Sequence, residues 1–243
     1  MQAVILAGGR GTRLLPITRT IPKAMIPVCG RPFLEYQLAL LKHHGVTDII
    51  LCTGYLGEML ESHFGDGSRL GVSIRYGRES HQLLGTAGAL QNVERLLDEE
   101  FFVTYGDGYL AMDYQRAMTY FRERRRLGLM VVYKNRDRYE RSNVVVRGHF
   151  VAAYDKHHRL PEMEYIDFGV SILRKEALRH VRPGQTSALE ELHADLITQH
   201  QLLAYKTRRR FYEIGSPQGL SEFDALVRAG RKRASRPDRV LVQ

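Results

Sequence analysis

The chain begins with the residues MQAVILAGGRGTRL (residues 1–14), and this stretch decides the fold. The apolar run from Ala3 to Leu6 is typical of a buried strand, and it leads directly into three glycines and two arginines. Because glycine has no Cβ, a ligand can approach its backbone closely, and successive N–H groups can then hold an anion. The stretch therefore predicts either a tight structural turn or a loop that binds phosphate groups.

The composition is that of one globular domain, since 44% of the 243 residues are hydrophobic and 26% are charged. No apolar run is long enough to cross a membrane, and the amino terminus lacks the pattern of a signal peptide. The two cysteines, Cys29 and Cys52, are too few for a disulfide framework or a Cys-rich zinc site. We therefore expect a cytoplasmic protein with reduced thiols and no membrane partner, while a homo-oligomer stays open.

The net charge of +9 comes largely from two basic runs, residues 122–126 and residues 228–239. The first run follows a helical pattern and is interpreted as a solvated face. The second is interpreted as part of a basic carboxy-terminal tail, residues 228–243, that follows one domain of residues 1–227. Because no aromatic-interleaved basic surface accompanies these runs, we expect no specific nucleic-acid partner.

Strand and helix patterns alternate along the rest of the chain. Strands are expected at residues 48–53, 72–76, 101–105, 129–133, 165–173 and 202–205. Helices are expected from Pro32, at residues 56–64, 87–97 and 114–126, behind a capping box at residues 187–190, and from Ser216. Two short strands at residues 143–146 and 150–154 predict a hairpin. The expected fold is α/β, a Rossmann-like, mainly parallel (mixed) sheet flanked by helices, with this small β-hairpin as a subregion.

Two familiar phosphate-binding patterns do not fit the glycine-rich stretch. A Walker loop needs a Gly-Lys-Ser/Thr sequence, which does not follow the glycines. A dinucleotide-binding fingerprint needs glycine three places after Gly11, where Leu14 stands. A loop of the sugar nucleotidyltransferase kind remains, in which Arg10 and Arg13 would add guanidinium groups suited to phosphate oxygens.

The glycine-rich stretch and the residues IPKAMIPV (residues 21–28) resemble the signature of the nucleotidyltransferases that make nucleotide sugars. The likeness continues in family order through residues 54–57, 65–68, 84–89, 106–107 and 215–217, and it covers nearly the whole chain. The family's β-helix-bearing members are longer. The chain therefore resembles the compact type, which includes enzymes that act on heptose, mannose or N-acetylmuramate 1-phosphate, with heptose and mannose 1-phosphate guanylyltransferases as the nearest likeness.

The resemblance implies a reaction between an NTP and a sugar 1-phosphate that releases pyrophosphate and uses Mg²⁺. It implies catalytic roles for Arg13 and Lys23 on the triphosphate, and for Asp107 on the metal ion. Asp107 stands at the carboxyl end of an expected buried strand, where ligand sites open in such sheets. Glu213 occupies the place of the family's second metal-binding aspartate, so metal position or metal number is open.

The nucleotide is expected to bind along the glycine-rich loop and near a second glycine-containing motif. The residues that the resemblance implies are Leu6, Ala7, Gly8, Gly9, Gly11, Thr12, Arg13, Glu79, Gly85, Thr86 and Ala87. Glu79 falls near the family's base-reading position. Since a carboxylate only accepts hydrogen bonds, it suits guanine, whose pairing edge offers two adjacent donors. The sequence therefore favours GTP, with a plain surface role for Glu79 as the alternative.

The sugar phosphate is expected to bind through Lys156, Glu164, Asp167 and Gly169, in segments that resemble the family's acceptor-binding motifs. Asp167 replaces the usual asparagine, and either carboxylate could instead be ordinary surface charge. Two other functions stay open. One is cytidylyl or uridylyl transfer to another phosphate or phosphonate acceptor. The other is a non-catalytic regulatory subunit that binds nucleotide sugars, which the departures at Asp167 and Glu213 motivate.

Overall fold

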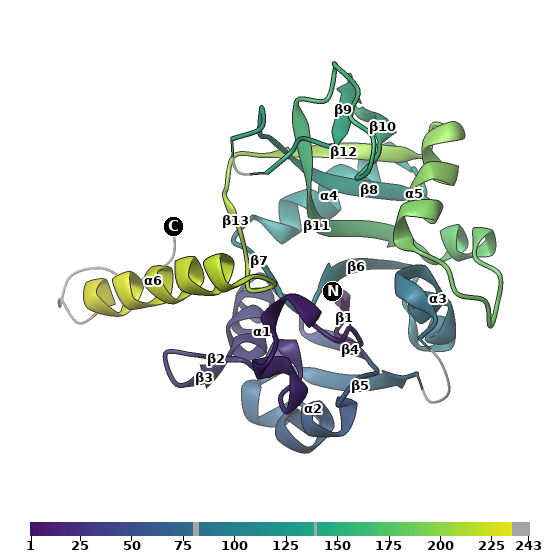
Figure 1. Cartoon of the computed structure of the whole chain (residues 1–243). Coiled ribbons are helices and arrows are strands. Elements are labelled where there is room, and N and C mark those ends of the chain that lie inside the picture. The colour runs from purple at the N-terminus through teal and green to yellow at the C-terminus, as the bar shows by residue number, and fades with distance from the viewer. Residues whose placement is uncertain (80–82, 139, 235–243) are drawn as a thin grey trace.

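The computed structural model describes residues 1–79, 83–138 and 140–234 (Figure 1). Its strands are β1 (Gln2–Leu6), β2 (Pro27–Val28), β3 (Arg31–Pro32), β4 (Asp48–Thr53), β5 (Ser73–Arg78), β6 (Glu100–Tyr105), β7 (Gly108–Leu110), β8 (Gly128–Lys134), β9 (Val144–Arg147), β10 (Phe150–Tyr154), β11 (Tyr165–Arg174), β12 (Leu202–Thr207) and β13 (Phe211–Glu213). Its α-helices are α1 (Phe33–His43), α2 (Gly57–Phe64), α3 (Gly85–Asn92), α4 (Tyr114–Arg124), α5 (Leu189–Thr198) and α6 (Pro217–Ala234).

Within the described residues, nine strands form one sheet in the order β5-β4-β1-β6-β11-β8-β12-β10-β9. The strands β5, β4, β1 and β6 pair in parallel, and so do β8 and β12. β11 runs antiparallel to both of its neighbours, β6 and β8, and β9 and β10 form the expected hairpin at one edge. The predicted mixed α/β fold is therefore confirmed.

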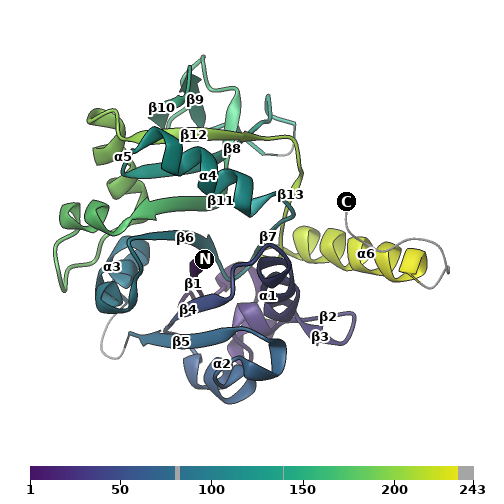
Figure 2. The same ribbon diagram turned by 180° about the vertical axis from the view of Figure 1, so that it is seen from behind.

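Alternate residues of β1 point to opposite faces of the sheet, as a strand requires. Ala3 and Ile5 belong to the core under α1, α2 and α4, and Val4 and Leu6 belong to the core under α3 and α5. Figure 2, seen from behind, shows α1 and α4 in front of the sheet that they cover. Burial on both faces explains why β1 is apolar throughout instead of alternating with polar residues.

Helix α1 follows the apolar stripe that the sequence shows. Leu34, Leu38 and Leu41 are each at most 1% exposed and pack onto the sheet. The helix begins directly after Pro32 and ends before Gly45, which has a φ of +75°. The predicted start and stop are confirmed, and the buried stripe fixes the helix against the sheet.

The predicted capping box before α5 is wrong by one residue. The helix begins at Leu189, and the carboxylate of Glu191, not of Glu190, accepts hydrogen bonds from the Ser187 hydroxyl (2.7 Å) and the Ala188 N–H (3.3 Å). Glu190 instead pairs with a lysine across the site described below. Helix α3 also differs, because it begins at residue 85 and ends at residue 92, and a 3₁₀ turn follows at residues 94–96.

The strands β7 and β13 were not predicted, since three residues each are too short to show a period. They pair antiparallel, with Glu213 opposite Gly108, and a hydrogen bond of 2.9 Å from Ile214 N to Asp107 O extends the pair. This small ladder lies beside the end of β6 (Figure 1) and brings a late segment of the chain to the segment that carries Asp107.

Helix α6 starts as predicted, because the Ser216 hydroxyl accepts a hydrogen bond of 3.0 Å from Gly219 N. Phe223 anchors it in a third core cluster, 4.9 Å from the ring centroid of Phe33. The helix projects from the body of the molecule and continues to Ala234, past the expected domain end at residue 227 (Figure 1). Residues 235–243 of the expected basic tail lie outside the described residues.

None of the described helices combines the length and the apolar character that crossing a membrane requires.

Candidate active site

The parallel strands β1, β4 and β6 end at the same edge of the sheet, and backbone hydrogen bonds join the loops that follow them. Ala7 N donates to Cys52 O (2.9 Å), Tyr55 N to Gly8 O (3.1 Å) and Gly106 N to Leu6 O (2.9 Å). These loops and the start of α3 enclose a cavity of about 200 Å³ that we call the loop cavity. Its lining residues are Leu6, Ala7, Gly8, Gly9, Lys23, Ala24, Cys52, Glu79, Leu83, Gly85, Thr86, Ala89, Tyr105, Gly106 and Asp107.

Glu79 forms one wall of the loop cavity. A Cβ on Gly8 would lie 2.9 Å from its Oε2 atom, so only glycine fits there without a shift. Its Oε1 atom accepts a hydrogen bond of 2.9 Å from Leu84 N. Burial raises the pKa of Glu79 above its ordinary value, although the bond from Leu84 acts in the opposite direction. Glu79 is thus a half-buried hydrogen-bond acceptor beside the glycine-rich loop.

Lys23 and Asp107 form an ion pair at the open end of this cavity. The Nζ atom of Lys23 lies 2.5 Å from Oδ2 of Asp107, and their side chains are 23% and 15% exposed. Lys23 follows Pro22 in a 3₁₀ turn, and Asp107 follows the carboxyl end of β6. A cation and an anion are therefore held at the edge of the sheet where β1, β4 and β6 end.

Glu213 and Arg13 reach the same place from other segments. A Cβ on Gly215 would touch Oε2 of Glu213 and would lie 2.9 Å from Nη2 of Arg13 and 3.0 Å from Oδ2 of Asp107. The Glu213 carboxylate also accepts the Ser216 hydroxyl, at 2.7 Å, and Gly215 N–H. Two carboxylates and two cations thus face one small volume, which glycine at position 215 leaves open.

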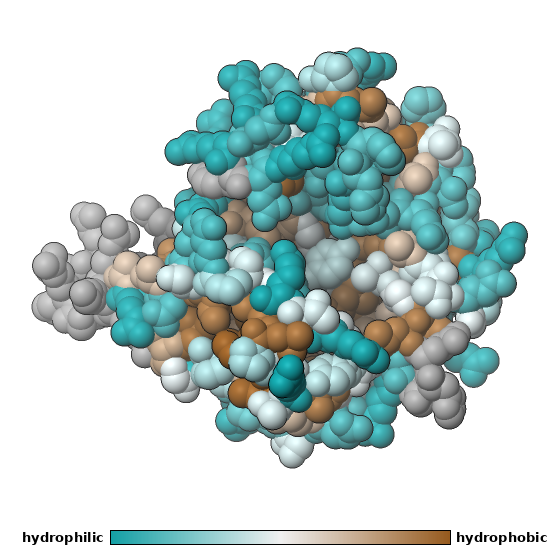
Figure 3. Space-filling model, viewed as in Figure 1, coloured by the Kyte–Doolittle hydropathy of each residue, from teal (hydrophilic) through white to brown (hydrophobic). Residues whose placement is uncertain are grey.

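A second cavity, of about 500 Å³, opens beside the first toward the β9–β10 hairpin, and we call it the hairpin cavity. Its lining residues are Arg13, Lys23, Tyr105, Asp107, Glu140, Arg141, Ser142, Asn143, Asp155, Lys156, Ile166, Asp167, Phe168, Gly169, Phe211 and Glu213. Lys23, Tyr105 and Asp107 line both cavities. Figure 3 shows this face of the molecule hollowed between the amino-terminal part and the part that carries β9 and β10.

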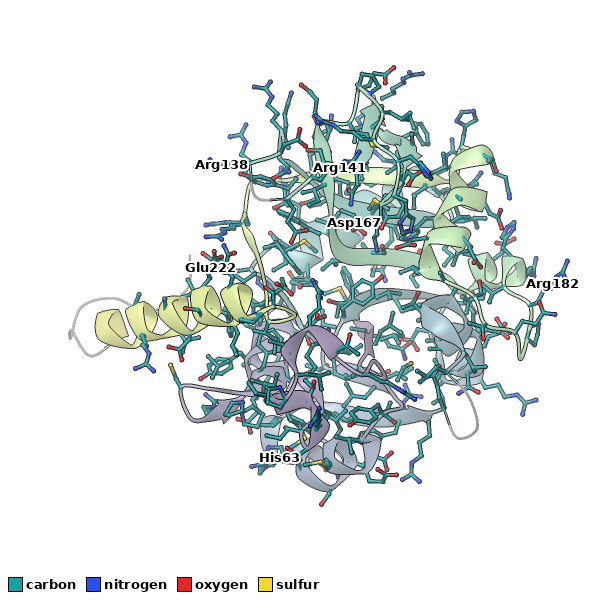
Figure 4. All side chains as sticks on the ribbon, in the orientation of Figure 1. His63, Arg138, Arg141, Asp167, Arg182 and Glu222 are labelled. Carbon is teal, nitrogen blue, oxygen red and sulfur yellow. The ribbon has the colours of Figure 1, made fainter. Side chains whose placement is uncertain are left out.

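Asp167 lies on β11 at the wall of the hairpin cavity, where Figure 4 labels it below Arg141. Its Oδ2 atom accepts the Tyr154 hydroxyl, and its Oδ1 atom accepts Gly169 N–H, both at 2.9 Å. Burial raises the pKa of Asp167, against the lowering effect of the Gly169 bond and of the charge of Lys156. Lys156 pairs with Glu190 at the start of α5. The hairpin cavity therefore presents an acceptor and a partly exposed cation.

The model of the nucleotidyl transferase family matches residues 2–152 of this chain. The chain belongs to the nucleotidyl transferase family. The resemblance expected from the glycine-rich stretch is thereby confirmed, and the matched region contains every residue of the loop cavity. Most of the residues that line only the hairpin cavity lie beyond it.

Curated relatives and a solved structure show the same likeness. Mannose-1-phosphate guanylyltransferase catalytic subunit beta of Danio rerio is 31% identical over 228 residues, which are 90% of this chain and 62% of that protein. UTP--glucose-1-phosphate uridylyltransferase of Synechocystis sp. is 40% identical over 135 residues, which are 51% of this chain and 35% of that protein. This nucleotidyl transferase therefore spans only part of the length of these relatives. The crystal structure of HddC from Yersinia pseudotuberculosis matches with a TM-score of 0.77 and 25% identity, over 93% of this chain and 99% of that one.

Some predicted site residues of this nucleotidyl transferase do not line either cavity. Gly11 has a φ of +62° and directly precedes the 3₁₀ turn Thr12–Leu14, in which Thr12 is exposed. Ala87 is fully buried, and its N–H donates to Ser187 O at 2.9 Å. These three residues therefore present no side chain to either cavity.

Glu164 also lies outside both cavities. Its carboxylate is 3.0 Å from Nζ of Lys134 and 3.6 Å from Nε of Arg136, so it neutralises surface cations instead of facing the hairpin cavity. It directly precedes β11, whose Ile166, Asp167, Phe168 and Gly169 line the hairpin cavity, but its own ion pairs hold it outside that cavity. The structure thus separates two carboxylates that the sequence places close together.

The sequence reasoning missed Tyr105 and Arg141, which line the cavities. Tyr105 directly precedes Gly106 and Asp107 at the carboxyl end of β6, so its position was a usable signal. Arg141 lies in an irregular segment without periodicity, where no local pattern indicates which way a side chain points.

Proposed function

We propose that this nucleotidyl transferase joins an NTP, with GTP preferred, to a sugar 1-phosphate and releases pyrophosphate, with Mg²⁺ as its cofactor. The observation that carries the proposal is the junction of the two cavities at Lys23, Tyr105 and Asp107. Two substrates that must exchange a group need separate spaces with one shared boundary, and here that boundary carries fixed charges. The names of the aligned relatives support the same reaction class.

In this reaction an oxygen of the sugar 1-phosphate bonds to the α-phosphorus of the NTP. The bond from that phosphorus to the bridging oxygen of the β-phosphate breaks, and pyrophosphate leaves with the electron pair. Both reactants are anions, so catalysis consists mainly of positioning and charge neutralisation. Lys23 and Arg13 supply positive charge beside the shared boundary, and the glycine-rich loop supplies N–H groups and close backbone approach.

The residues at the boundary also fit a magnesium ion. Mg²⁺ in phosphate-binding sites is usually held by one or two carboxylates, with substrate phosphates and water completing its coordination. Asp107 and Glu213 face the same space beside Gly215 and so form a pair of this kind. In the described part of the chain, no group of three or more His, Cys, Asp or Glu side chains is suited to a metal. Mg²⁺ held by these two carboxylates would neutralise phosphate charge and orient the triphosphate.

The preference for GTP rests on Glu79. A carboxylate accepts hydrogen bonds and donates none at neutral pH, and guanine presents an N1–H and an exocyclic amine side by side. Among the described residues no cation pairs with Glu79, and its Oε2 atom lies beside the Gly8 and Gly54 backbones at the cavity wall. In the hairpin cavity, Lys156 would bind the sugar phosphate and Asp167 would accept hydrogen bonds from sugar hydroxyls.

The direct test measures pyrophosphate release from every combination of four NTPs with the 1-phosphates of glucose, mannose, heptose and N-acetylmuramate. We expect release that requires Mg²⁺ and is fastest with GTP. Phosphonate and non-sugar phosphate acceptors, with CTP and UTP as donors, extend the panel to the alternative reaction. Nucleotide binding without pyrophosphate release from any pair would contradict the proposal and favour a regulatory subunit.

The variant Asp107→Asn removes one charge at the boundary and keeps the side-chain size. We expect at least a hundredfold loss of kcat, because electrostatic stabilisation at such sites contributes on the order of several kcal/mol. Asp98→Asn is the matched control, since Asp98 is exposed and precedes the amino end of the same strand, β6. Equal activity of the two variants would exclude the boundary as the reaction centre. A cytoplasmic location and a homo-oligomer stay predictions.

A further inference from the structure

We infer that Gln37 is a positioning residue that fixes the backbone turn on which Asp107 stands. Gln37 lies on α1, outside both cavities, and is 2% exposed. Its Nε2 atom lies 2.9 Å from Tyr105 O, 2.9 Å from Gly108 O and 3.3 Å from Thr104 Oγ1. Figures 1 and 2 agree in placing α1 beside β7, the strand that begins directly after Asp107.

The two carbonyl groups flank Asp107 on both sides along the chain. An amide nitrogen has two hydrogens, and the two shorter contacts, to Tyr105 O and Gly108 O, use them both. Other hydrogen bonds fix the backbone between these two carbonyls. Gly106 N donates to Leu6 O, and Asp107 O accepts from Ile214 N, each at 2.9 Å. Gln37 therefore completes a set of bonds that leaves this turn one conformation.

The orientation of the Gln37 amide follows from its partners. Only the NH₂ group can satisfy two carbonyl oxygens, so the reverse orientation would set oxygen against oxygen. The Oε1 atom consequently has no hydrogen-bond partner among the described residues. Leaving both carbonyls buried and unpaired would cost more than this single unpaired acceptor. A glutamine is thus required here for its donors and not for its volume.

The turn needs such support because the Asp107 carboxylate must keep several contacts at the same time. It must stay 2.5 Å from Lys23 while it faces Glu213 and Arg13 around Gly215. A displacement of about 1 Å in a reacting group can cost on the order of a hundredfold in rate. The core residues Leu34 and Leu38 fix α1 on the sheet, so the position of Gln37 is set by the core.

The test compares Gln37→Met with Gln2→Met. Gln2 is also fully buried, donates to Asp48 Oδ2 (2.8 Å) and Leu96 O (3.2 Å), and accepts from Asp98 N (2.8 Å). It lies at the amino end of β1, at the edge of the sheet opposite the two cavities. Both variants lose a buried amide and are expected to unfold at a lower temperature than the wild type.

Only Gln37→Met is expected to disturb Asp107. Titration with Mn²⁺ alone, followed by electron paramagnetic resonance, should show about tenfold weaker binding to Gln37→Met than to Gln2→Met. In turnover, which rests on the proposed function, Gln37→Met should lower kcat at least tenfold and change KM for GTP less than twofold, because Glu79 and the glycine-rich loop are untouched. Equal Mn²⁺ binding and equal kcat in the two variants would overturn the inference.

A second variant covers the case in which Gln37→Met does not fold. Gln37→Glu keeps the shape, and its carboxyl group donates one hydrogen bond only while protonated. Its kcat relative to wild type should therefore rise as the pH is lowered from 8 to 6, and an unchanged ratio across this range would count against the inference. If the wild type binds Mn²⁺ but releases no pyrophosphate with any pair, the proposed function fails, and the difference in Mn²⁺ binding alone decides the role of Gln37.

Discussion

At the level of single residues, the two carboxylates of the loop cavity have different surroundings. Asp107 is paired with Lys23 at the open boundary, whereas Glu79 accepts only a backbone N–H of Leu84 in its described contacts. Burial raises the pKa of Glu79, so its proton is held more tightly than that of an exposed glutamate. These differences suit Asp107 to a cation and Glu79 to the donors of a nucleobase.

Substitution of Glu79 should change the preference for the base. In Glu79→Gln we expect KM for GTP to rise about tenfold, because a charge-assisted hydrogen bond contributes roughly 1.5–3 kcal/mol and the amide offers one acceptor atom instead of two. ITP lacks the exocyclic amine, so the ratio of kcat/KM for GTP to that for ITP should fall. Glu58→Gln, an exposed change on α2, is the control.

The pH dependence follows from the same pKa. Because protonation removes the acceptor, KM for GTP should rise as the pH is lowered through the raised pKa of Glu79. The rise should begin at a higher pH than an ordinary glutamate would cause. It should be absent from Glu79→Gln, whose amide does not titrate, and a rise of equal size in that variant would contradict the assignment.

At the level of elements, the short ladder of β7 and β13 brings Glu213 to Asp107, and Gly215 keeps the space between them open. In Gly215→Ala, the new methyl group would displace the carboxylates and the Arg13 guanidinium, so we expect kcat to fall about a hundredfold. The φ of Gly215 lies outside the left-handed region, so little backbone strain is expected.

Gly148→Ala is the matched control for this change. Gly148 has a φ of +59°, but nothing lies within 4 Å of its added Cβ. Backbone strain of about 1–2 kcal/mol should lower its unfolding temperature without lowering kcat. Gly215→Ala should show the reverse pattern, and loss of stability with unchanged kcat there would mean that position 215 is structural only.

An ion cluster joins α1 to neighbouring elements through Glu35. Its carboxylate is 3.0 Å from Arg31 and 3.1 Å from Nε2 of His63 on α2. Burial alone would raise the pKa of Glu35, but hydrogen bonds from His63 and Arg31 outweigh burial and hold the pKa below its ordinary value of 4.5. A lowered acid pKa stabilises the folded state fully above pH 4.5, and this contribution is lost as the pH falls through the folded-state value.

Glu35→Gln should therefore lower the free energy of unfolding by about 1 kcal/mol at pH 7, a modest value because Arg31 and His63 are partly exposed. The difference from wild type should shrink as the pH is lowered from 5 to 3. Urea unfolding at several pH values measures it. Glu99→Gln, at an exposed position, should show no such pH-dependent difference, and a constant deficit in Glu35→Gln would exclude the ion cluster as its cause.

At the level of the whole molecule, the two halves of the nine-stranded sheet contribute different cavities. The parallel amino-terminal strands carry the loop cavity, and β11 with the segments directly before β9 and after β10 carries most of the hairpin cavity. Because the spaces share only Lys23, Tyr105 and Asp107, changes in the hairpin cavity away from these residues and from Arg13 and Glu213 should leave nucleotide binding intact.

Lys156→Ala tests this division. We expect KM for the sugar 1-phosphate to rise at least tenfold, since a charged hydrogen bond to phosphate is lost, while the Kd for GTP changes less than twofold. Lys134→Ala is the matched control, because Lys134 is a similarly exposed lysine whose partner Glu164 lies outside the cavity. A parallel loss of GTP affinity in Lys156→Ala would show that the two spaces are not independent.

Much of the architecture could be predicted because its causes are local. The apolar run at residues 3–6, the stripe of Leu34, Leu38 and Leu41, and the cap at Ser216 each report a buried face or a helix end within a few residues. The family motifs likewise identified the glycine-rich loop, and with it the class of protein, without any coordinates.

The arrangement of charges at the cavity boundary was decided only in three dimensions. Pairing of β7 with β13 brings Glu213 to Asp107, ion pairs with Lys134 and Arg136 hold Glu164 outside both cavities, and packing of α1 carries Gln37 under the turn at Tyr105. These contacts join residues far apart in the chain, and a periodic pattern records which face is buried but not which distant segment covers it. The sequence by itself therefore determined the fold class and the position of the glycine-rich loop, whereas tertiary packing alone determined which charges meet.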